Sequence, residues 1–288
     1  MAKPHGKLVQ VKGKNMHLRQ MGTGERTIVL LPGLGCPLPT VEFAPLMREL
    51  SKKYTVCIVE FFGYGHSDST DTPRTNENYV EEVREALTQV GLKPPYILMP
   101  YSISGVYSEF YVAKYPGEVD GLILLDCTPT IEEFAKKWTY SEDEIEELKT
   151  ALKSAENQEE APLDEEEIND LIAEYLEHGY TMEELEEFDE VPNHLDTLVA
   201  QDIALSDNIF EVLDMPIPKE LPVLAFSSGL VELEDGERAE FEKYRKDHMA
   251  RFGERSKLVI IDGSSHIDIA YHRDYLKIIS REIEAFLG

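Results

Sequence analysis

The chain has 288 residues, of which 42% are hydrophobic, and it carries 56 acidic against 28 basic side chains, for a net charge of −28. This length and composition are ordinary for one globular domain with an insert and a single main core. The acidic balance disfavours nucleic acid as a partner, and the lack of a leader-like start or of an apolar run near about 18 residues predicts a cytoplasmic protein that makes no membrane contact.

Two buried-strand runs come first along the chain. Thr27–Leu31 is a continuous apolar run that ends in the loop PGLG at 32–35. Tyr54–Glu60 is a second apolar run, and it ends in the Gly-rich turn FFGYGHSD at 61–68. Short apolar runs that end in such turns predict strands in the core of a sheet.

A third strand run contains the most informative serine. Tyr96–Met99 leads into the turn PYSIS at 100–104 and then into a helix. A serine with small residues two positions before and after it is typical of a nucleophile elbow, in which a strained turn presents the hydroxyl at the tip of a parallel sheet. Ser102 has Pro100 and Ser104 at these flanks, where glycine is usual. For this segment alone, an ordinary turn with a capping serine remains the alternative interpretation.

Ser104 is the competing nucleophile. The residue two positions after Ser104 is Val106, whose side chain is too bulky for this turn. Ser102 is therefore the predicted nucleophile.

An acidic insert follows the next apolar run, Gly121–Leu125, and precedes the run Val223–Phe226. Residues 131–220 contain 29 acidic and 5 basic residues, a net of −24 out of the chain's −28. The acidic faces are expected to be solvated. A functional interpretation is that their field repels anionic substrates and attracts cationic ones.

Apolar residues recur at helical spacing within this insert. The first stripe is Ile145, Leu148 and Leu152, after Ser141 and Glu144 at the spacing of a capping box. A second stripe covers 168–176 and ends at Gly179, and a third helix begins at Thr181. We expect these stripes to lie on the carboxyl edge of the sheet.

The last strand run, Lys257–Ile261, leads into the loop DGSSH at 262–266 and a terminal helix at 274–287. A serine nucleophile requires a neutral imidazole to take its proton and a buried carboxylate to orient that imidazole. His266 is the predicted base because it follows a late strand in a Gly-Ser loop. His66, in the turn after the second run, is the runner-up.

These segments, in this order, resemble the α/β-hydrolase fold across the whole chain except the insert. The resemblance implies a mostly parallel central sheet flanked by helices, with a core domain of residues 1–129 and 221–288. It also implies that residues 130–220 form an acidic helical cap inserted between strands six and seven. By position in the family, the backbone N–H groups of Leu34 and Ile103 would form the oxyanion hole.

The same resemblance leaves two candidates for the triad acid. Most members carry the acid after the seventh strand, where this chain has Val231 followed by Glu232. A minority use a carboxylate at the end of the sixth strand, which here is Asp126. Asp126 is the favoured acid and Glu232 the alternative, with Asp268 and Asp235 as lesser candidates.

The resulting prediction is a serine hydrolase that cleaves small-molecule carboxylic esters through an acyl-enzyme. Aromatic side chains under the cap could form the substrate pocket, although aromatics at helical spacing are commonly core. The pocket candidates are Tyr101, Trp138 and Tyr140, with Phe134 and Met182. Amidase, aminopeptidase or lactonase activity on the same triad is the nearest alternative, and a catalytically weak relative that binds a ligand or partner is another.

No cofactor or metal is predicted. No strand is followed by GxGxxG, and there is no P-loop. The three cysteines, Cys36, Cys57 and Cys127, include no CxxC pair, so neither a zinc site nor a disulfide framework is expected.

Overall fold

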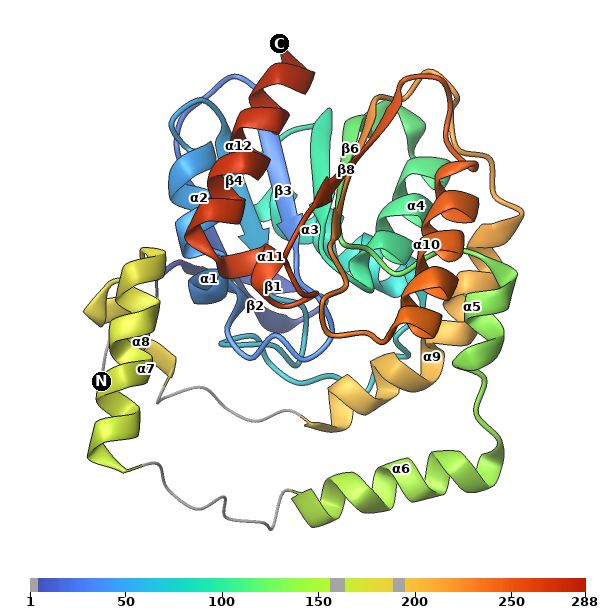
Figure 1. Ribbon diagram of the computed structural model, residues 1–288, viewed down its shortest axis with the longest axis horizontal. Helices are drawn as coiled ribbons and strands as arrows, with labels where there is room; N and C mark the ends of the chain where they lie inside the picture. The colour runs from blue at the N-terminus through green and yellow to red at the C-terminus, as the bar shows by residue number, and fades with distance from the viewer. Residues whose placement is uncertain (1–4, 156–163, 189–194) are drawn as a thin grey trace.

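A mostly parallel sheet lies at the centre of the protein (Figure 1). The computed structural model describes residues 5–155, 164–188 and 195–288, and these form eight strands. The strands are β1 (Lys7–Val11), β2 (Lys14–Met21), β3 (Thr27–Leu31), β4 (Thr55–Val59), β5 (Tyr96–Pro100), β6 (Val119–Leu125), β7 (Val223–Ser228) and β8 (Ser256–Ile261). Each strand run predicted from the sequence coincides with one of β3 to β8.

The strand order is β1-β2-β4-β3-β5-β6-β7-β8. β1 pairs antiparallel with β2, β2 pairs antiparallel with β4, and all later pairings are parallel. The chain moves one way from β3 to β4 and the opposite way from β5 onward. This reversal makes the carboxyl ends of β3 and β5 the place where a crevice is expected.

Helices cover both faces of the sheet. The core helices are α1 (Pro39–Glu42), α2 (Ala44–Leu50), α3 (Asn76–Gln89), α4 (Ser104–Lys114), α10 (Asp235–Met249), α11 (Asp268–Tyr271) and α12 (Arg273–Leu287). Crossovers between parallel strands are right-handed. The helices between β3 and β4 therefore lie on one face of the sheet, and the helices that connect strands in the opposite direction lie on the other face. Accordingly, α2 packs with α12, and α3 packs with α4 (Figure 1).

The strands at the centre of the sheet are buried on both sides. Every residue of β3, β4, β5 and β7 is buried. A continuous apolar run, in place of strict alternation, is what a parallel strand covered on both faces requires. This core holds the carboxyl ends of the strands at fixed positions.

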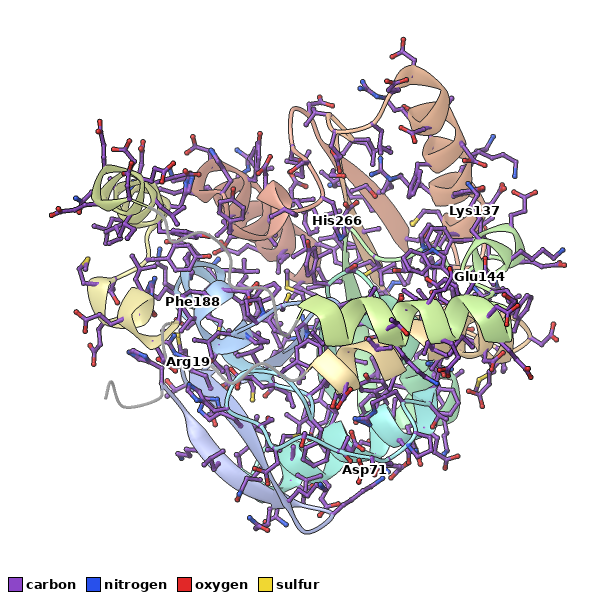
Figure 2. All side chains as sticks on the ribbon, turned by 90° about the horizontal axis from the view of Figure 1, so that it is seen from below. Arg19, Asp71, Lys137, Glu144, Phe188 and His266 are labelled. Carbon is purple, nitrogen blue, oxygen red and sulfur yellow. The ribbon has the colours of Figure 1, made fainter. Side chains whose placement is uncertain are left out.

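The insert is helical in its described part. It contains α5 (Glu132–Lys137), α6 (Glu142–Ala155), α7 (Glu165–His178), α8 (Met182–Phe188) and α9 (Leu195–Leu213). The predicted capping pairs are present, since Ser141 and Glu144 exchange hydrogen bonds between backbone and side chain, as do Thr181 and Glu184. α6 packs against α9, which in turn packs on α5 of the insert and on α4 of the core (Figure 1 and Figure 2).

The second apolar stripe does not lie on the sheet edge as predicted. Ile168, Leu171 and Leu176 on α7 are 43%, 42% and 40% exposed. The end of α7 instead lies against α11, where Tyr175 and His178 contact the ring of Tyr271. Near this end of α7, Tyr175 also packs with Tyr180 against Leu38 and Val41 of the core.

No helix among the described residues is long and apolar enough to cross a membrane.

Candidate active site

Three strand ends bring the predicted site residues to one edge of the sheet. Leu31 at the end of β3 pairs with Pro100 at the end of β5. Tyr101 forms a bridge with Leu125 at the end of β6. The loop after β3, the turn at Ser102 and the residue after β6 are therefore neighbours, although up to about a hundred positions separate them in the sequence.

Ser102 occupies a sharp turn between β5 and α4. Its φ is +54°, a left-handed conformation that is unusual for a residue with a side chain. A Cβ atom on Gly33 would lie 3.0 Å from the Ser102 Cβ, and one on Gly105 would lie 2.6 Å from the Cys127 Cβ. Gly105 thus allows the close approach of helix and strand that glycine two residues after the serine usually permits.

His266 lies between Ser102 and Asp126. Its Nε2 is 3.1 Å from the Ser102 Oγ, and its Nδ1 is 2.7 Å from the Asp126 Oδ2. Both are hydrogen-bond distances. The three side chains therefore form one continuous chain of hydrogen bonds from hydroxyl to carboxylate, in the arrangement of a catalytic triad.

Asp126 is held by three partners. Its second oxygen, Oδ1, accepts from the backbone N–H of Ser228 at 2.9 Å and from Nη2 of Arg245 at 3.3 Å. Burial alone would raise the pKa of Asp126, but the hydrogen bond and charge of His266, the Arg245 guanidinium and the Ser228 N–H together lower it below its usual value. Asp126 is therefore a stable carboxylate, and only Oδ2 faces the imidazole.

Glu232 contacts the same histidine at a different atom. Its Oε1 accepts from the backbone N–H of His266 at 2.9 Å. Asp268, another candidate acid, accepts from Ser265 and from Tyr271. Neither carboxylate occupies the position at the His266 ring that Asp126 does.

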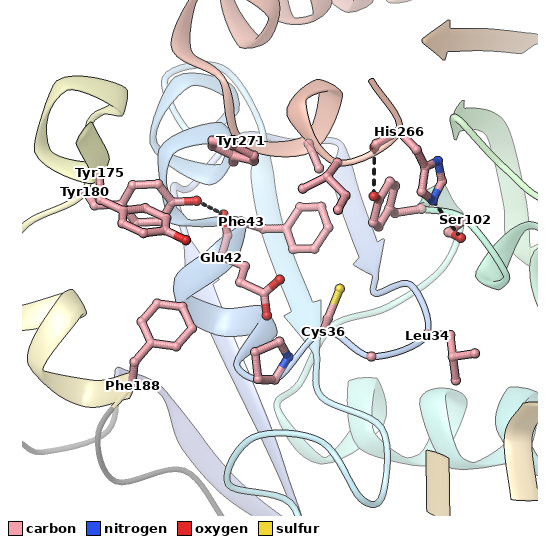
Figure 3. Close-up of a pocket in the computed structure, with 15 residues that line it drawn as sticks. Leu34, Cys36, Glu42, Phe43, Ser102, Tyr175, Tyr180, Phe188, His266 and Tyr271 are labelled. Atoms are coloured by element: carbon pink, nitrogen blue, oxygen red, sulfur yellow. Dashed lines mark hydrogen bonds between the residues drawn. The ribbon is translucent and has the colours of Figure 1, made fainter. Parts of the chain in front are cut away.

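Tyr101 supports the loop that carries the histidine. Its hydroxyl donates to the backbone oxygen of His266 at 2.9 Å, and the two rings stack with centroids 5.0 Å apart. Figure 3 shows Ser102 and His266 next to each other at one end of the cavity. The hydrogen bond and the ring stacking thus hold the imidazole of His266 in position next to the turn that carries Ser102.

The two runner-up residues face elsewhere. Ser104 is fully buried, and its hydroxyl donates to the backbone oxygen of Pro32. The Nε2 of His66 is 2.8 Å from Glu187 on α8. The structure brings neither of them to the Ser102–His266 pair.

Two backbone N–H groups near Ser102 are available to a ligand. Ile103 precedes the first residue of α4, and Leu34 lies in the loop after β3. Within the described residues, neither N–H donates to another group of the protein. Both therefore remain candidates for binding an oxyanion.

Two cavities adjoin Ser102 and His266. The first, of about 440 Å³, extends from Ser102 past Tyr101 and Phe43 to aromatic residues of the insert (Figure 3). The second, of about 320 Å³, includes Phe134 and Trp138. Ser102 and His266 therefore lie where the two cavities meet.

Not every aromatic pocket candidate lies in these cavities. Tyr140 lines neither of them, and its hydroxyl donates to Asp202 at 3.2 Å. Met182 also lines neither and is 46% exposed. Tyr101, which directly follows β5, and Trp138, which directly follows α5, are on the cavity walls.

Several residues at the site carry no sequence signal. Arg245 lies in the middle of α10, and Glu42 ends the short helix α1. Tyr175 and Tyr180 come from the insert and Tyr271 from α11. These residues can be recognised as part of the site only in the folded structure, where their separate elements lie next to the turn that carries Ser102.

In the part of the chain that the structure describes, no group of three or more His, Cys, Asp or Glu side chains is arranged to hold a metal ion.

Part of this sequence is similar to known proteins. A family model described as alpha/beta hydrolase fold matches residues 26–152. Uncharacterized protein YbdG of Bacillus subtilis is 38% identical over 126 residues, covering 44% of this chain and 39% of that protein. Serine hydrolase BPHL of Homo sapiens is 29% identical over 119 residues, covering 40% of each chain. The matched part thus spans about two fifths of the length of these curated relatives.

A solved structure matches most of the length of the chain. The crystal structure of Cfl2 from Burkholderia cenocepacia superposes with a TM-score of 0.71 at 16% identity and covers 98% of this chain and 95% of that one. At this identity the likeness concerns the fold alone.

Proposed function

The chain belongs to the α/β-hydrolase superfamily and has its fold, as the sequence predicted, and on that premise we propose that it is a serine hydrolase that cleaves carboxylic esters. The observation that carries the proposal is the continuous set of contacts from Ser102 Oγ to His266 Nε2 at 3.1 Å and from His266 Nδ1 to Asp126 at 2.7 Å. Serine with a base in reach and an oriented acid behind the base is the arrangement that activates a hydroxyl.

Acylation follows from this geometry. His266 takes the Ser102 proton as the oxygen forms a bond to the ester carbonyl carbon. The carbonyl oxygen becomes an oxyanion, which the N–H groups of Leu34 and Ile103 would bind. The carbon–oxygen bond of the ester then breaks, and the imidazolium returns its proton to the leaving alcohol.

Deacylation repeats the same steps with water. His266 removes a proton from the water while the water oxygen attacks the acyl carbon. The bond between the acyl carbon and Ser102 Oγ then breaks, and the imidazolium returns its proton to Ser102. Asp126 keeps Nδ1 protonated and Nε2 free in each resting state. The products are a carboxylic acid and an alcohol.

We further propose that residues 130–220 act as the cap over this site. Tyr175, Tyr180 and Phe188 line the first cavity, and Phe134 and Trp138 line the second. The core supplies the reacting groups and the insert much of the surrounding apolar wall. The insert would therefore control which substrates reach Ser102.

A fluorophosphonate probe tests the proposal, because it reacts only with an activated serine. We expect the wild-type protein to be labelled at Ser102 and to hydrolyse 4-nitrophenyl butyrate. Ser102→Ala should abolish both, and His266→Ala should lower the rate by several powers of ten. His66→Ala is the control and should keep both, since that ring pairs with Glu187.

A folded wild-type protein that neither reacts with the probe nor hydrolyses the ester would contradict the proposal and favour a ligand-binding role. Matched amide and lactone substrates distinguish the neighbouring activities. Faster cleavage of the amide or the lactone than of the ester would replace the proposed ester specificity.

A further inference from the structure

A carboxylate without a cationic partner lies in the larger cavity. Glu42, the last residue of α1, lines the same cavity as Ser102 and His266, and Figure 3 shows its side chain beside Cys36 and Phe43. Its Oε1 accepts from the backbone N–H of Leu38 at 2.9 Å, and the Cys36 thiol donates to the carboxylate. Among the described residues, no Lys, Arg or His forms an ion pair with it.

A neighbouring carboxylate provides the contrast. Glu60 is fully buried, and it accepts hydrogen bonds from Thr40 Oγ1, from the backbone N–H of His66 and from the ring of His17. These donors within the protein satisfy the hydrogen-bond acceptors of the Glu60 carboxylate. The carboxylate of Glu42 has capacity left, and that capacity faces the cavity.

Aromatic rings surround the remaining space. The walls near Glu42 include Phe43, which lies between α1 and α2, and the insert residues Tyr175, Tyr180 and Phe188. The hydroxyl of Tyr180 donates to the backbone oxygen of Glu42 at 2.7 Å, so the insert is joined to α1 at this residue. Aromatic faces attract cations, and a cation stabilises an ionised carboxylate in an apolar site.

Burial makes the charge of Glu42 costly. Desolvation raises the pKa of its carboxyl group to about 7, and the negative charge of Glu60 acts in the same direction. A positively charged group in the cavity would offset this cost. A neutral or anionic group would leave it in place or increase it.

We propose that this cavity is an ammonium subsite, in which Glu42 accepts N–H hydrogen bonds from a protonated amine of the substrate and the aromatic walls surround the cation. The inference rests on the proposed function and deepens it. The preferred substrates would be esters that carry a primary amine at the end of the acyl or alcohol part that enters this cavity. The acidic insert would attract such substrates toward the same opening.

Pairs of matched esters test the proposal. One series has ω-ammonium acyl chains and the other ω-ammonium alcohols, and each member is compared with an ester in which a methyl group replaces the ammonium. We expect the wild-type kcat/KM to favour the ammonium ester in at least one series. Glu42→Gln should reduce that preference by about ten- to a hundredfold, as expected for a charge-assisted hydrogen bond.

Glu49→Gln is the matched control, since it removes one carboxylate from the adjacent helix α2, where Glu49 pairs with Lys52 at the surface. It should leave the preference unchanged. In the wild type, the preference should also increase from about pH 6 to about pH 8 as Glu42 ionises. The ratio of the kcat/KM values of the two esters at each pH removes any pH effect that both esters share.

Binding of pentylammonium to Ser102→Ala, measured by calorimetry, separates this inference from the proposed function. Affinity that falls at least about tenfold in Ser102→Ala/Glu42→Gln supports the subsite, even if the wild-type protein shows no turnover. Turnover of neutral esters without any ammonium preference, or a preference that Glu42→Gln leaves unchanged, would overturn the subsite while the hydrolase proposal stands. A wild-type preference that does not vary with pH would also overturn it.

Discussion

Replacing Asp126 with asparagine tests which carboxylate orients the base. In the wild-type protein, Oδ2 faces His266 and Oδ1 accepts from the Ser228 N–H and from Arg245. An asparagine amide has one oxygen and one NH₂ group. Because two donors surround the Oδ1 position, the amide oxygen should occupy it and the NH₂ group should face the imidazole.

This orientation reverses the polarity at His266. The amide NH₂ would donate to Nδ1, so the ring would carry its proton on Nε2 and could not accept the proton of Ser102. Turning the amide over would place NH₂ against the Ser228 N–H and Arg245, at about 1–3 kcal/mol for each lost hydrogen bond. We therefore expect kcat to fall by roughly three to four powers of ten, as it does for the same change in the serine protease triad.

The assay compares two isosteric variants with an activated ester. Glu232→Gln keeps a carbonyl oxygen that can accept from the His266 backbone N–H. Its kcat should therefore remain within about tenfold of wild type, since only a nearby charge is lost. Circular dichroism and melting temperatures confirm that both variants are folded.

The opposite pattern would refute this reasoning. If Glu232→Gln lost most of the activity and Asp126→Asn kept it, the acid would lie after β7 and Asp126 would have only a structural role. Equal and small effects in both variants would mean that the His266–Asp126 contact does not limit the reaction.

Three further predictions follow from the described contacts. Ser104→Ala should keep probe labelling but destabilise the protein by about 1–3 kcal/mol, because the buried oxygen of Pro32 loses its donor; labelling lost in Ser104→Ala but kept in Ser102→Ala would place the elbow two residues later. Burial raises the pKa of Glu42 from its ordinary value of 4.5 to about 7, which costs the folded protein about 3 kcal/mol once the group ionises. Glu42→Gln should therefore raise the melting temperature above about pH 7 and have little effect near about pH 4.5; a variant less stable than wild type at about pH 8 would contradict this. Raising NaCl from about 0.1 M to about 1 M shortens the Debye length from about 10 Å to about 3 Å, so the melting temperature should rise because residues 131–220 carry a net charge of −24; a salt-independent melting temperature would mean that these charges are already compensated.

Local sequence patterns were sufficient for the secondary structure near the site. The apolar run Thr27–Leu31 is buried along its whole length, as a continuous hydrophobic strand must be. The capping pair Ser141 and Glu144 forms because its two members are three positions apart, which is a property of the helix alone. The sequence also singled out Ser102 and His266 as candidate site residues, because a turn at the end of a strand and a Gly-Ser loop after a late strand are both local features.

Tertiary structure decided everything that depends on how distant elements meet. The apolar stripe on α7 has helical spacing, but spacing does not specify a partner, and Ile168 and Leu171 are exposed. Asp126 and Glu232 were both acceptable acids in the sequence, and only the packing of β6 beside β7 places Asp126 at the ring of His266. Arg245 and Glu42 carry no local signal at all, since a side chain's role in a site depends on which atoms surround it, and those atoms come from elements far apart in the chain.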